Sequence, residues 1–300
     1  MLRGMREKCV ARRHDATFHE PPLQRGVLAS DDAFFRMPLN IRTYHELTEP
    51  DRSGLPGQIA AQRRRVAARL AGVGRVVALM SGKGGVGKSF ATAGLARALA
   101  RGGRAAGVLD ADFNGPTIPA LLRIPVTGCA LHENGVEPPV SPEGVRCFSM
   151  ALLLQDGRPL GFRGPDAESH VWRETLEAAA LREFLADVAW GALDRLLVDL
   201  PPGIQRFQEL AELLPAPPAV LTVTIPTTES RDAVRRAMQF ARERGAELLG
   251  VVENMVDGPF TGDAGEALAR EFAIPLVARV PFNPNVRVWD ELAQRMMSSS

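Results

Sequence analysis

The sequence contains few cysteines and no long apolar run. Its three cysteines, Cys9, Cys129 and Cys147, are too few for the disulfide framework of a secreted protein, and no C-x-x-C pair occurs. No stretch approaches the roughly 18 apolar residues of a membrane span, and the charged start of the chain lacks the apolar core of a secretory signal. We therefore expect a cytoplasmic protein with no membrane partner.

An excess of charge of one sign is lacking as well. The 36 lysines and arginines nearly balance the 35 acidic residues, which leaves a net charge of +1. Without a net positive charge, the chain is not expected to bind nucleic acid. Only three of the basic residues are lysines: Lys8, Lys83 and Lys88. In a chain that otherwise uses arginine, a lysine indicates a chemical requirement, and two of the three lie in one glycine-rich segment.

The character of the sequence changes near residue 57. Residues 1–57 show no sustained hydrophobic period and contain five prolines, and residues 1–75 hold 14 basic against 8 acidic side chains. This composition predicts a poorly ordered basic arm over 1–57. Residues 58–72 then predict a helix rich in alanine and arginine. We expect residues 58–300 to form a single domain.

Short apolar runs alternate with helical stretches from residue 75 onward. The apolar runs predict strands over 75–80, 105–110, 145–150, 194–200, 219–226, 247–254 and 275–281. Amphipathic patterns between several of them predict helices over 89–103, 173–188, 206–214, 229–244 and 263–272. The sequence therefore predicts an α/β fold with a doubly wound, mostly parallel sheet and helices on both faces. In such a sheet the carboxyl ends of the strands form one edge, where ligands bind.

A glycine-rich loop joins the first predicted strand to the helix that follows. The segment SGKGGVGKSF, residues 81–90, fits the pattern G-x-x-x-x-G-K-[ST]. Backbone N–H groups of such a loop surround phosphate oxygens, and the helix N-terminus attracts them. Lys88 would neutralise the β- and γ-phosphates, and the Ser89 hydroxyl would bind Mg²⁺. We predict that ATP and Mg²⁺ bind here, at Gly82, Gly84, Gly85, Val86, Gly87, Lys88, Ser89 and Phe90.

The loop and several later segments resemble a known family. With Lys83 included, the loop reads K-G-G-x-G-K-S and resembles the deviant P-loop ATPases, which include nitrogenase iron protein, MinD, ParA and the Mrp/ApbC iron–sulfur carriers. The segments DADFNGPTIPALL, FRGP, WGALDRLLVDLPPG and GVVENM resemble Mrp-type sequences and keep their order, at residues 110–122, 162–165, 190–203 and 250–255. The resemblance covers roughly residues 58–290 and implies a P-loop NTPase fold.

The resemblance also implies an activity. A protein of this kind binds and hydrolyses ATP with Mg²⁺ as a nucleotide-switched homodimer. It serves iron–sulfur cluster or metallocofactor assembly, and its partner is a client apoprotein or an assembly factor. In the family, the lysine that corresponds to Lys83 reaches the nucleotide bound by the partner subunit. An alternative is that Lys83 binds a switch carboxylate within its own protomer.

Further residues receive roles by the same resemblance. Asp112 joins Lys83 and Lys88 as a catalytic residue, positioned to orient the attacking water. Asp110 and Asp199 close predicted strands and, with Ser89, are expected to hold Mg²⁺ mostly through water. Asn254 also ends a strand and is expected to pair with the adenine ring.

Two departures from the family pattern stand out. Mrp-type carriers place a C-x-x-C pair after the E-N-M block, but residues 255–269 contain no cysteine. Because iron–sulfur clusters are held by thiolates, we expect no stable [4Fe–4S] cluster on this chain alone. The family's P-P-G-T-G-D is replaced by PPGIQR at residues 201–206, so its acidic end is missing.

Two other functions fit the same fold. A positioning ATPase like MinD would use a basic amphipathic helix at its C-terminus, but residues 286–300 contain two basic and two acidic side chains. A ParA-like protein would need a basic surface for DNA. A third possibility is a regulatory adaptor ATPase without cluster chemistry. We rank the role in metallocofactor assembly first.

Overall fold

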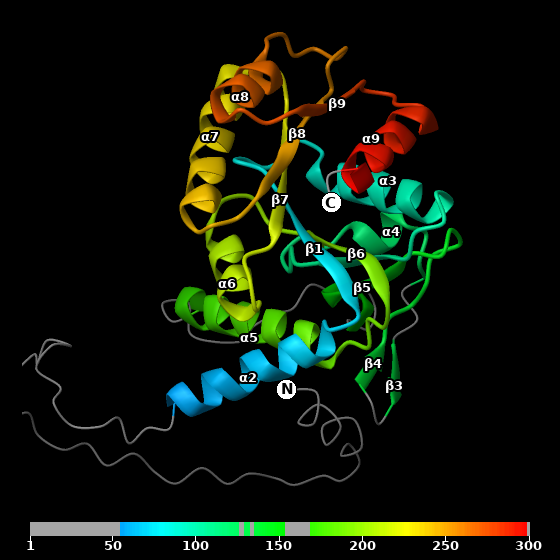
Figure 1. Cartoon of the computed structure of the whole chain (residues 1–300), viewed down its shortest axis with the longest axis vertical. Coiled ribbons are helices and arrows are strands. Elements are labelled where there is room, and N and C mark those ends of the chain that lie inside the picture. The colour runs from blue at the N-terminus through cyan, green and yellow to red at the C-terminus, as the bar shows by residue number, and fades with distance from the viewer. Residues whose placement is uncertain (1–54, 126–128, 133–134, 154–168, 299–300) are drawn as a thin grey trace, which may run out of the picture. The chain divides into compact units, whose positions relative to one another are not determined.

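The structure, a computed structural model, describes residues 55–125, 129–132, 135–153 and 169–298 (Figure 1). These residues belong to one compact unit within Ser53–Ser300. Most of the predicted basic arm, residues 1–54, lies outside the described residues, as does the R-G-P element at 162–165. The arm was predicted to extend to residue 57, but helix α2 (Leu55–Arg69) already begins at Leu55. Pro56 is compatible with that start, because a proline is tolerated in the first turn of a helix.

Seven parallel strands form the central sheet, as predicted. Their order is β5-β2-β6-β1-β7-β8-β9, and every neighbouring pair is parallel. The strands are β1 (Val73–Met80), β2 (Ala106–Asp110), β5 (Arg146–Ser149), β6 (Leu193–Asp199), β7 (Ala219–Thr224), β8 (Leu248–Asn254) and β9 (Leu276–Val280). Each predicted strand is present, and no strand end differs from its predicted position by more than two residues. The chain therefore has the doubly wound α/β fold that its apolar runs indicate.

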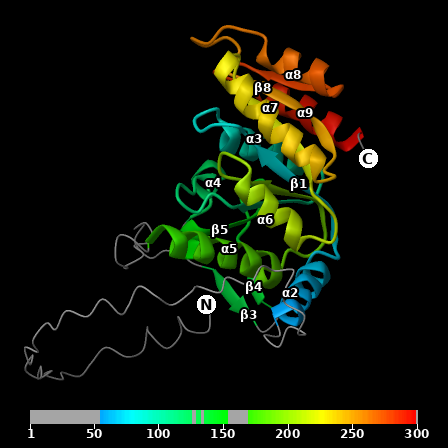
Figure 2. The same ribbon diagram turned by 90° about the vertical axis from the view of Figure 1, so that its left-hand side faces the viewer.

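Helices cover both faces of this sheet. They are α3 (Lys88–Arg101), α4 (Ile118–Leu121), α5 (Ser169–Asp187), α6 (Gln205–Leu213), α7 (Thr228–Glu243), α8 (Ala264–Phe272) and α9 (Val286–Ser298). Figure 1 shows α3, α4 and α9 on one side of the sheet, where they share a core with β1 and β2, and α6, α7 and α8 on the other. Figure 2 shows the molecule from the side on which α6 and α7 lie. Helix α2 packs against α5.

Three short elements and the longer helix α9 were not predicted. A hairpin of β3 (Ala130–His132) and β4 (Gly135–Glu137), the short helix α4 and a 3-10 turn over Met150–Leu153 lie between β2 and α5. The two strands, α4 and the 3-10 turn each have four residues or fewer, too short for a hydrophobic period to reveal them, whereas α9 has 13 residues and was missed although its buried residues recur at helical spacing. In the part of the chain that the structure describes, no helix is both long and apolar enough to cross a bilayer.

Candidate nucleotide-binding site

The phosphate loop lies between the carboxyl end of β1 and the start of α3. Gly85 and Gly87 adopt left-handed backbone conformations, with φ of 78° and 81°, which glycine adopts without strain. Gly87 occupies the N-cap of α3, and no side chain caps this end of the helix. The first N–H groups of α3 are therefore available to an anion, and the helix dipole favours one.

Two glycines of the loop are also required by close packing. A Cβ atom on Gly82 would lie 2.2 Å from the carbonyl carbon of Ala233 in α7, and one on Gly87 would lie 2.2 Å from Nδ2 of Asn254. Both distances are far inside van der Waals contact. The loop is thus packed against α7 on one side and against the end of β8 on the other, which holds its backbone in place.

Asp199, at the end of β6, lies directly beneath this loop and accepts three side-chain hydrogen bonds. The Lys88 Nζ donates to Oδ1 over 2.6 Å, Thr92 Oγ1 donates to the same oxygen over 2.7 Å, and Ser89 Oγ donates to Oδ2 over 2.6 Å. Lys88 and Asp199 are almost completely buried, with side-chain exposures of 6% and 1%. The structure thus brings together Lys88, Ser89 and Asp199, which the sequence had predicted to share one site.

Thr92 was missed by the sequence analysis. Its Oγ1 also lies 3.0 Å from the carbonyl oxygen of Lys88, one helical turn earlier, so the two acceptors share one hydroxyl hydrogen. The spacing in the sequence could have indicated this role, because a residue four positions after Lys88 lies on the same face of α3. The buried Thr92 side chain therefore helps to orient the Asp199 carboxylate, and this contact makes it part of the site.

Asp110 lies beside Asp199, because β2 and β6 pair in register at these two residues. Burial raises the pKa of Asp110 from 3.8 to about 7, and the neighbouring Asp199 charge adds to the effect. The N–H groups of Ile118 and Asp112 and the Ser149 hydroxyl donate to its oxygens over 3.1 to 3.3 Å, which opposes the rise. The pKa of this carboxyl is therefore shifted from the acidic range toward neutral pH in the nucleotide-free protein.

The oxygen groups present suit Mg²⁺ held partly by water. Ser89, Asp199 and Asp110 offer one hydroxyl and two carboxylates, a set that matches the preference of Mg²⁺ for oxygen ligands and retained waters. Among the described residues, no group of three or more His, Cys, Asp or Glu side chains is arranged to hold a metal ion by itself. The donor set therefore fits Mg²⁺ bound together with phosphate oxygens.

Asp112 and Lys83 lie at the edge of this network. The Asp112 carboxylate accepts the Gly115 N–H of its own loop over 3.3 Å and makes no described contact with Asp199. The Lys83 side chain is half-buried and forms no ion pair among the described residues. Glu229, at the start of α7, has a lowered pKa, first through its own N–H and the Thr227 hydroxyl and more weakly through the Lys83 charge. Lys83 therefore has a carboxylate in its own chain nearby.

Asn254 and Phe90 flank the loop on the β8 and β9 side of the sheet. The buried Asn254 Nδ2 donates to the carbonyl oxygen of Val86 over 2.9 Å, so this amide supports the phosphate loop directly. Its predicted contact with adenine stays a prediction. Phe90 is 42% exposed and contacts Trp289 of α9 edge to face, with ring centroids 5.6 Å apart.

The described cysteines lie away from the loop where carriers place their C-x-x-C pair. Cys147 is buried in β5, and Cys129 is half-buried just before β3. Burial raises the pKa of Cys129 to about 11 and that of Cys147 well above its ordinary value. Thiolate formation, which cluster binding requires, is therefore disfavoured at both residues.

Solved structures share the overall fold. A nucleotide-binding protein from Archaeoglobus fulgidus, in complex with ADP, is 31% identical with a TM-score of 0.62 over 78% of this chain and 93% of its own. The cell division ATPase MinD of Pyrococcus furiosus, 19% identical with a TM-score of 0.55 over 76% of this chain and all of its own, shares the fold.

Two further proteins are similar to this chain in sequence over about three quarters of its length. An iron-sulfur cluster carrier protein of Saccharolobus solfataricus is 34% identical over 241 residues, 76% of this chain and 78% of its own length. The cytosolic Fe-S cluster assembly factor NUBP2 of Bos taurus is 38% identical over 234 residues, 72% of this chain and 82% of its own. Residues 72–300 match the ParA family described as NUBPL iron-transfer P-loop NTPase. The chain, with its phosphate loop placed over Asp199, belongs to this family of P-loop NTPases.

Proposed function

We propose that this protein binds and hydrolyses Mg·ATP and that this activity serves iron–sulfur cluster assembly. The observation that carries the proposal is the buried cluster in which Lys88, Ser89 and Thr92 converge on Asp199 beneath the phosphate loop. Membership of the family and the names of its relatives support the cellular role, and the name of NUBP2 supports a cytoplasmic location.

The residues divide the chemistry among them. When ATP binds, Lys88 exchanges the Asp199 carboxylate for the β- and γ-phosphates, while the N–H groups at the start of α3 hold phosphate oxygens. Ser89 and Asp199, with Asp110, would hold Mg²⁺, which would supply positive charge to the transferred phosphoryl group. Asp112 orients the attacking water from the loop that follows Asp110. Asn254 contacts the base while its Nδ2 supports Val86.

Hydrolysis is proposed to take place in a homodimer, with Lys83 contributed across the interface. A half-buried ammonium with no ion pair of its own among the described residues is available to a phosphate of the partner's nucleotide. The alternative, in which Lys83 holds a carboxylate of its own chain, has Glu229 as its candidate.

The iron–sulfur role proposed here does not include a cluster on the loop after β8. Met255–Asp263 contains no cysteine, and the described cysteines are buried to an extent that disfavours thiolate. We expect anaerobic reconstitution with iron and sulfide to give no visible absorbance of a [4Fe–4S] cluster. About one cluster per dimer would contradict this. The absence of cysteine in this loop favours, as a second candidate, an adaptor ATPase that acts on a partner protein.

Replacement of the phosphate-loop lysine tests the nucleotide site. Lys88→Met should abolish most binding of a fluorescent ATP analogue, because the phosphates lose their fixed counter-charge. Arg104→Met, at a half-exposed residue beyond the far end of α3, is the matched control and should bind like the wild type. Circular dichroism shows whether each variant is folded. Folded Lys88→Met with wild-type affinity would refute the assignment.

A further inference from the structure

Arg206 is a buried cation at an unusual place, the first turn of α6. The turn Pro201–Gly203 follows Asp199, and Arg206 lies three residues beyond it, where the resemblance in the sequence led us to expect an acidic residue. A positive side chain at a helix N-terminus opposes the helix dipole, and α6 has no acidic residue in its first turn. The Arg206 side chain is nevertheless only 8% exposed, so its position requires compensating partners.

Those partners come from α5 and α6. The Nη2 of Arg206 donates to Oε2 of Glu177 in α5, and its Nη1 donates to Oε2 of Glu209, one turn further along α6. The guanidinium also lies over the ring of Phe113, 5.1 Å from its centroid. Arg206 therefore binds two carboxylates and one aromatic ring, and the ring belongs to the loop that carries Asp112.

Glu177 connects Arg206 to the same loop a second time. While Oε2 accepts Arg206, Oε1 accepts the Asn114 Nδ2 over 3.2 Å. Phe113 is itself held by an edge-to-face contact with Phe184 of α5, with centroids 5.6 Å apart. The loop after β2 is thus attached to Arg206 by the Phe113 ring and through Glu177.

The turn before α6 contacts the phosphate loop. The Gly203 N–H donates to the carbonyl oxygen of Ser81 over 3.1 Å. Pro202 lies beside Gly84, with its Cγ 3.7 Å from where a Cβ would project. The phosphate loop contacts the turn, the chain leads from the turn through two residues to Arg206, and Arg206 contacts the loop that carries Asp112.

We propose that Arg206 is a positioning residue that makes the turn Pro201–Gly203 and the Asp112 loop move as one unit when nucleotide binds or is hydrolysed. This inference rests on the proposed ATPase function. The guanidinium is suited to the task because its planar fork can hold two carboxylates while its face rests on an aromatic ring. A lysine would keep the charge but not the two-sided geometry.

Steady-state ATP hydrolysis is the first test. Arg206→Met should leave ATP affinity within about twofold and lower kcat by between about twofold and thirtyfold, the range of measured couplings. Arg206→Lys should give an intermediate kcat. Asn114→Ala should lower kcat less, and the double variant Asn114→Ala/Arg206→Met should lose less than the product of the two single effects, since both act through Glu177.

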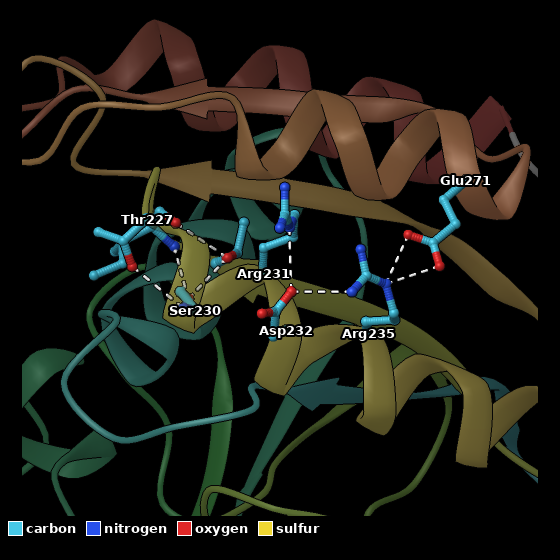
Figure 3. A network of polar contacts seen from close by, with 8 residues as sticks. Thr227, Ser230, Arg231, Asp232, Arg235 and Glu271 are labelled. Atoms are coloured by element: carbon cyan, nitrogen blue, oxygen red, sulfur yellow. Dashed lines mark hydrogen bonds and ion pairs between the residues drawn. The ribbon is translucent and has the colours of Figure 1, made fainter.

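Arg235 provides a matched control. Like Arg206, it forms two ion pairs, as Figure 3 shows: one with Asp232, one turn away on its own helix α7, and one with Glu271 on α8. Its network reaches no loop of the site within the described residues. Arg235→Met should therefore keep the wild-type kcat and ATP affinity. A wild-type kcat for Arg206→Met, or equal losses in both arginine variants, would overturn the inference.

Amide hydrogen exchange separates this inference from the proposed function. In nucleotide-free protein, Arg206→Met on α6 should raise exchange over residues 111–117 relative to Arg235→Met, at a temperature where both variants are folded. Unchanged exchange there would overturn the link. Failure of the wild type to bind or hydrolyse ATP would instead refute the proposed function, and the exchange result would still decide the link.

Discussion

At the scale of single residues, the site depends on two carboxylates that lie buried side by side. Asp199 is compensated by Lys88, Ser89 and Thr92, whereas Asp110 receives only neutral hydrogen-bond donors. Burial therefore disfavours the charge of Asp110 more than its contacts favour it. The neutral form of the Asp110 carboxyl is thus favoured up to a higher pH than that of an exposed aspartate.

Asp110 predicts a pH dependence of stability in the nucleotide-free protein. Its pKa is higher in the folded state, about 7 against 3.8, so the folded state binds the proton more tightly. Its contribution to the free energy of unfolding is fully present below about pH 4 and is lost as the pH rises through 7. The loss amounts to at most about 4 kcal/mol. Asp110→Asn should remove this slope from urea unfolding measured between pH 5 and 8.

Ser149→Ala is the companion variant for that measurement. The Ser149 hydroxyl lowers the pKa of Asp110, so its removal should move the loss of stability to higher pH without abolishing it. Equal slopes in the wild type and in Asp110→Asn would show that another group causes the dependence.

At the scale of elements, the strands follow from the sequence more directly than the helices do. Runs such as AVLTVT in β7 are buried at every position, so their apolar pattern is continuous and easily recognised. Helix α5 begins at Ser169, earlier than the predicted 173, and α2 ends at Arg69 rather than at 72. Helix ends depend on capping and on tertiary contacts, which a hydrophobic period does not contain.

The packing of α3 against α9 gives a prediction at this scale. Gly94→Ala in the middle of α3 would ordinarily stabilise the helix by about 0.5–1 kcal/mol. Here the new Cβ would lie 2.6 Å from the indole ring of Trp289 in α9, and overpacking of this kind costs about 1–3 kcal/mol. We expect a net loss of about 1–2 kcal/mol in urea unfolding. A double-mutant cycle with Trp289→Leu should show coupling between the two sites, and a stabilised Gly94→Ala would contradict the packing.

At the scale of the whole molecule, the doubly wound fold was predictable and the assembly was not. The alternation of apolar strands with helices leads to a parallel sheet whose carboxyl edge collects Lys88, Asp110, Asp199 and Asn254. The roles of these residues in binding and catalysis stay predictions. Whether two copies share the site depends on a surface that one chain does not define.

Lys83 provides the test of that assembly. Lys83→Ala should keep ATP binding but lose most turnover, and wild-type specific activity should rise with protein concentration. In a heterodimer of Lys83→Ala with Asp112→Asn, action in trans leaves one complete site, because the Asp112→Asn subunit supplies its lysine to the partner. Recovery of part of the activity on mixing is therefore expected. No recovery, despite heterodimers confirmed by tagged pull-down, would assign Lys83 to its own protomer, with Glu229 as the carboxylate to examine.

The sequence by itself determined the phosphate loop, the family and the strands. These features depend on local properties, namely glycines in a fixed spacing and apolar residues in short runs. Only the tertiary structure decided that Thr92 joins Lys88 and Ser89 on Asp199, that Asn254 supports Val86, and that Arg206 joins α5 to the loop of Asp112. These contacts join residues that are distant in the chain. The raised pKa of Asp110 likewise depends on a distant residue, Asp199. Both exist because parallel strands bring their carboxyl ends to one buried edge, where each polar group must find a partner or change its charge.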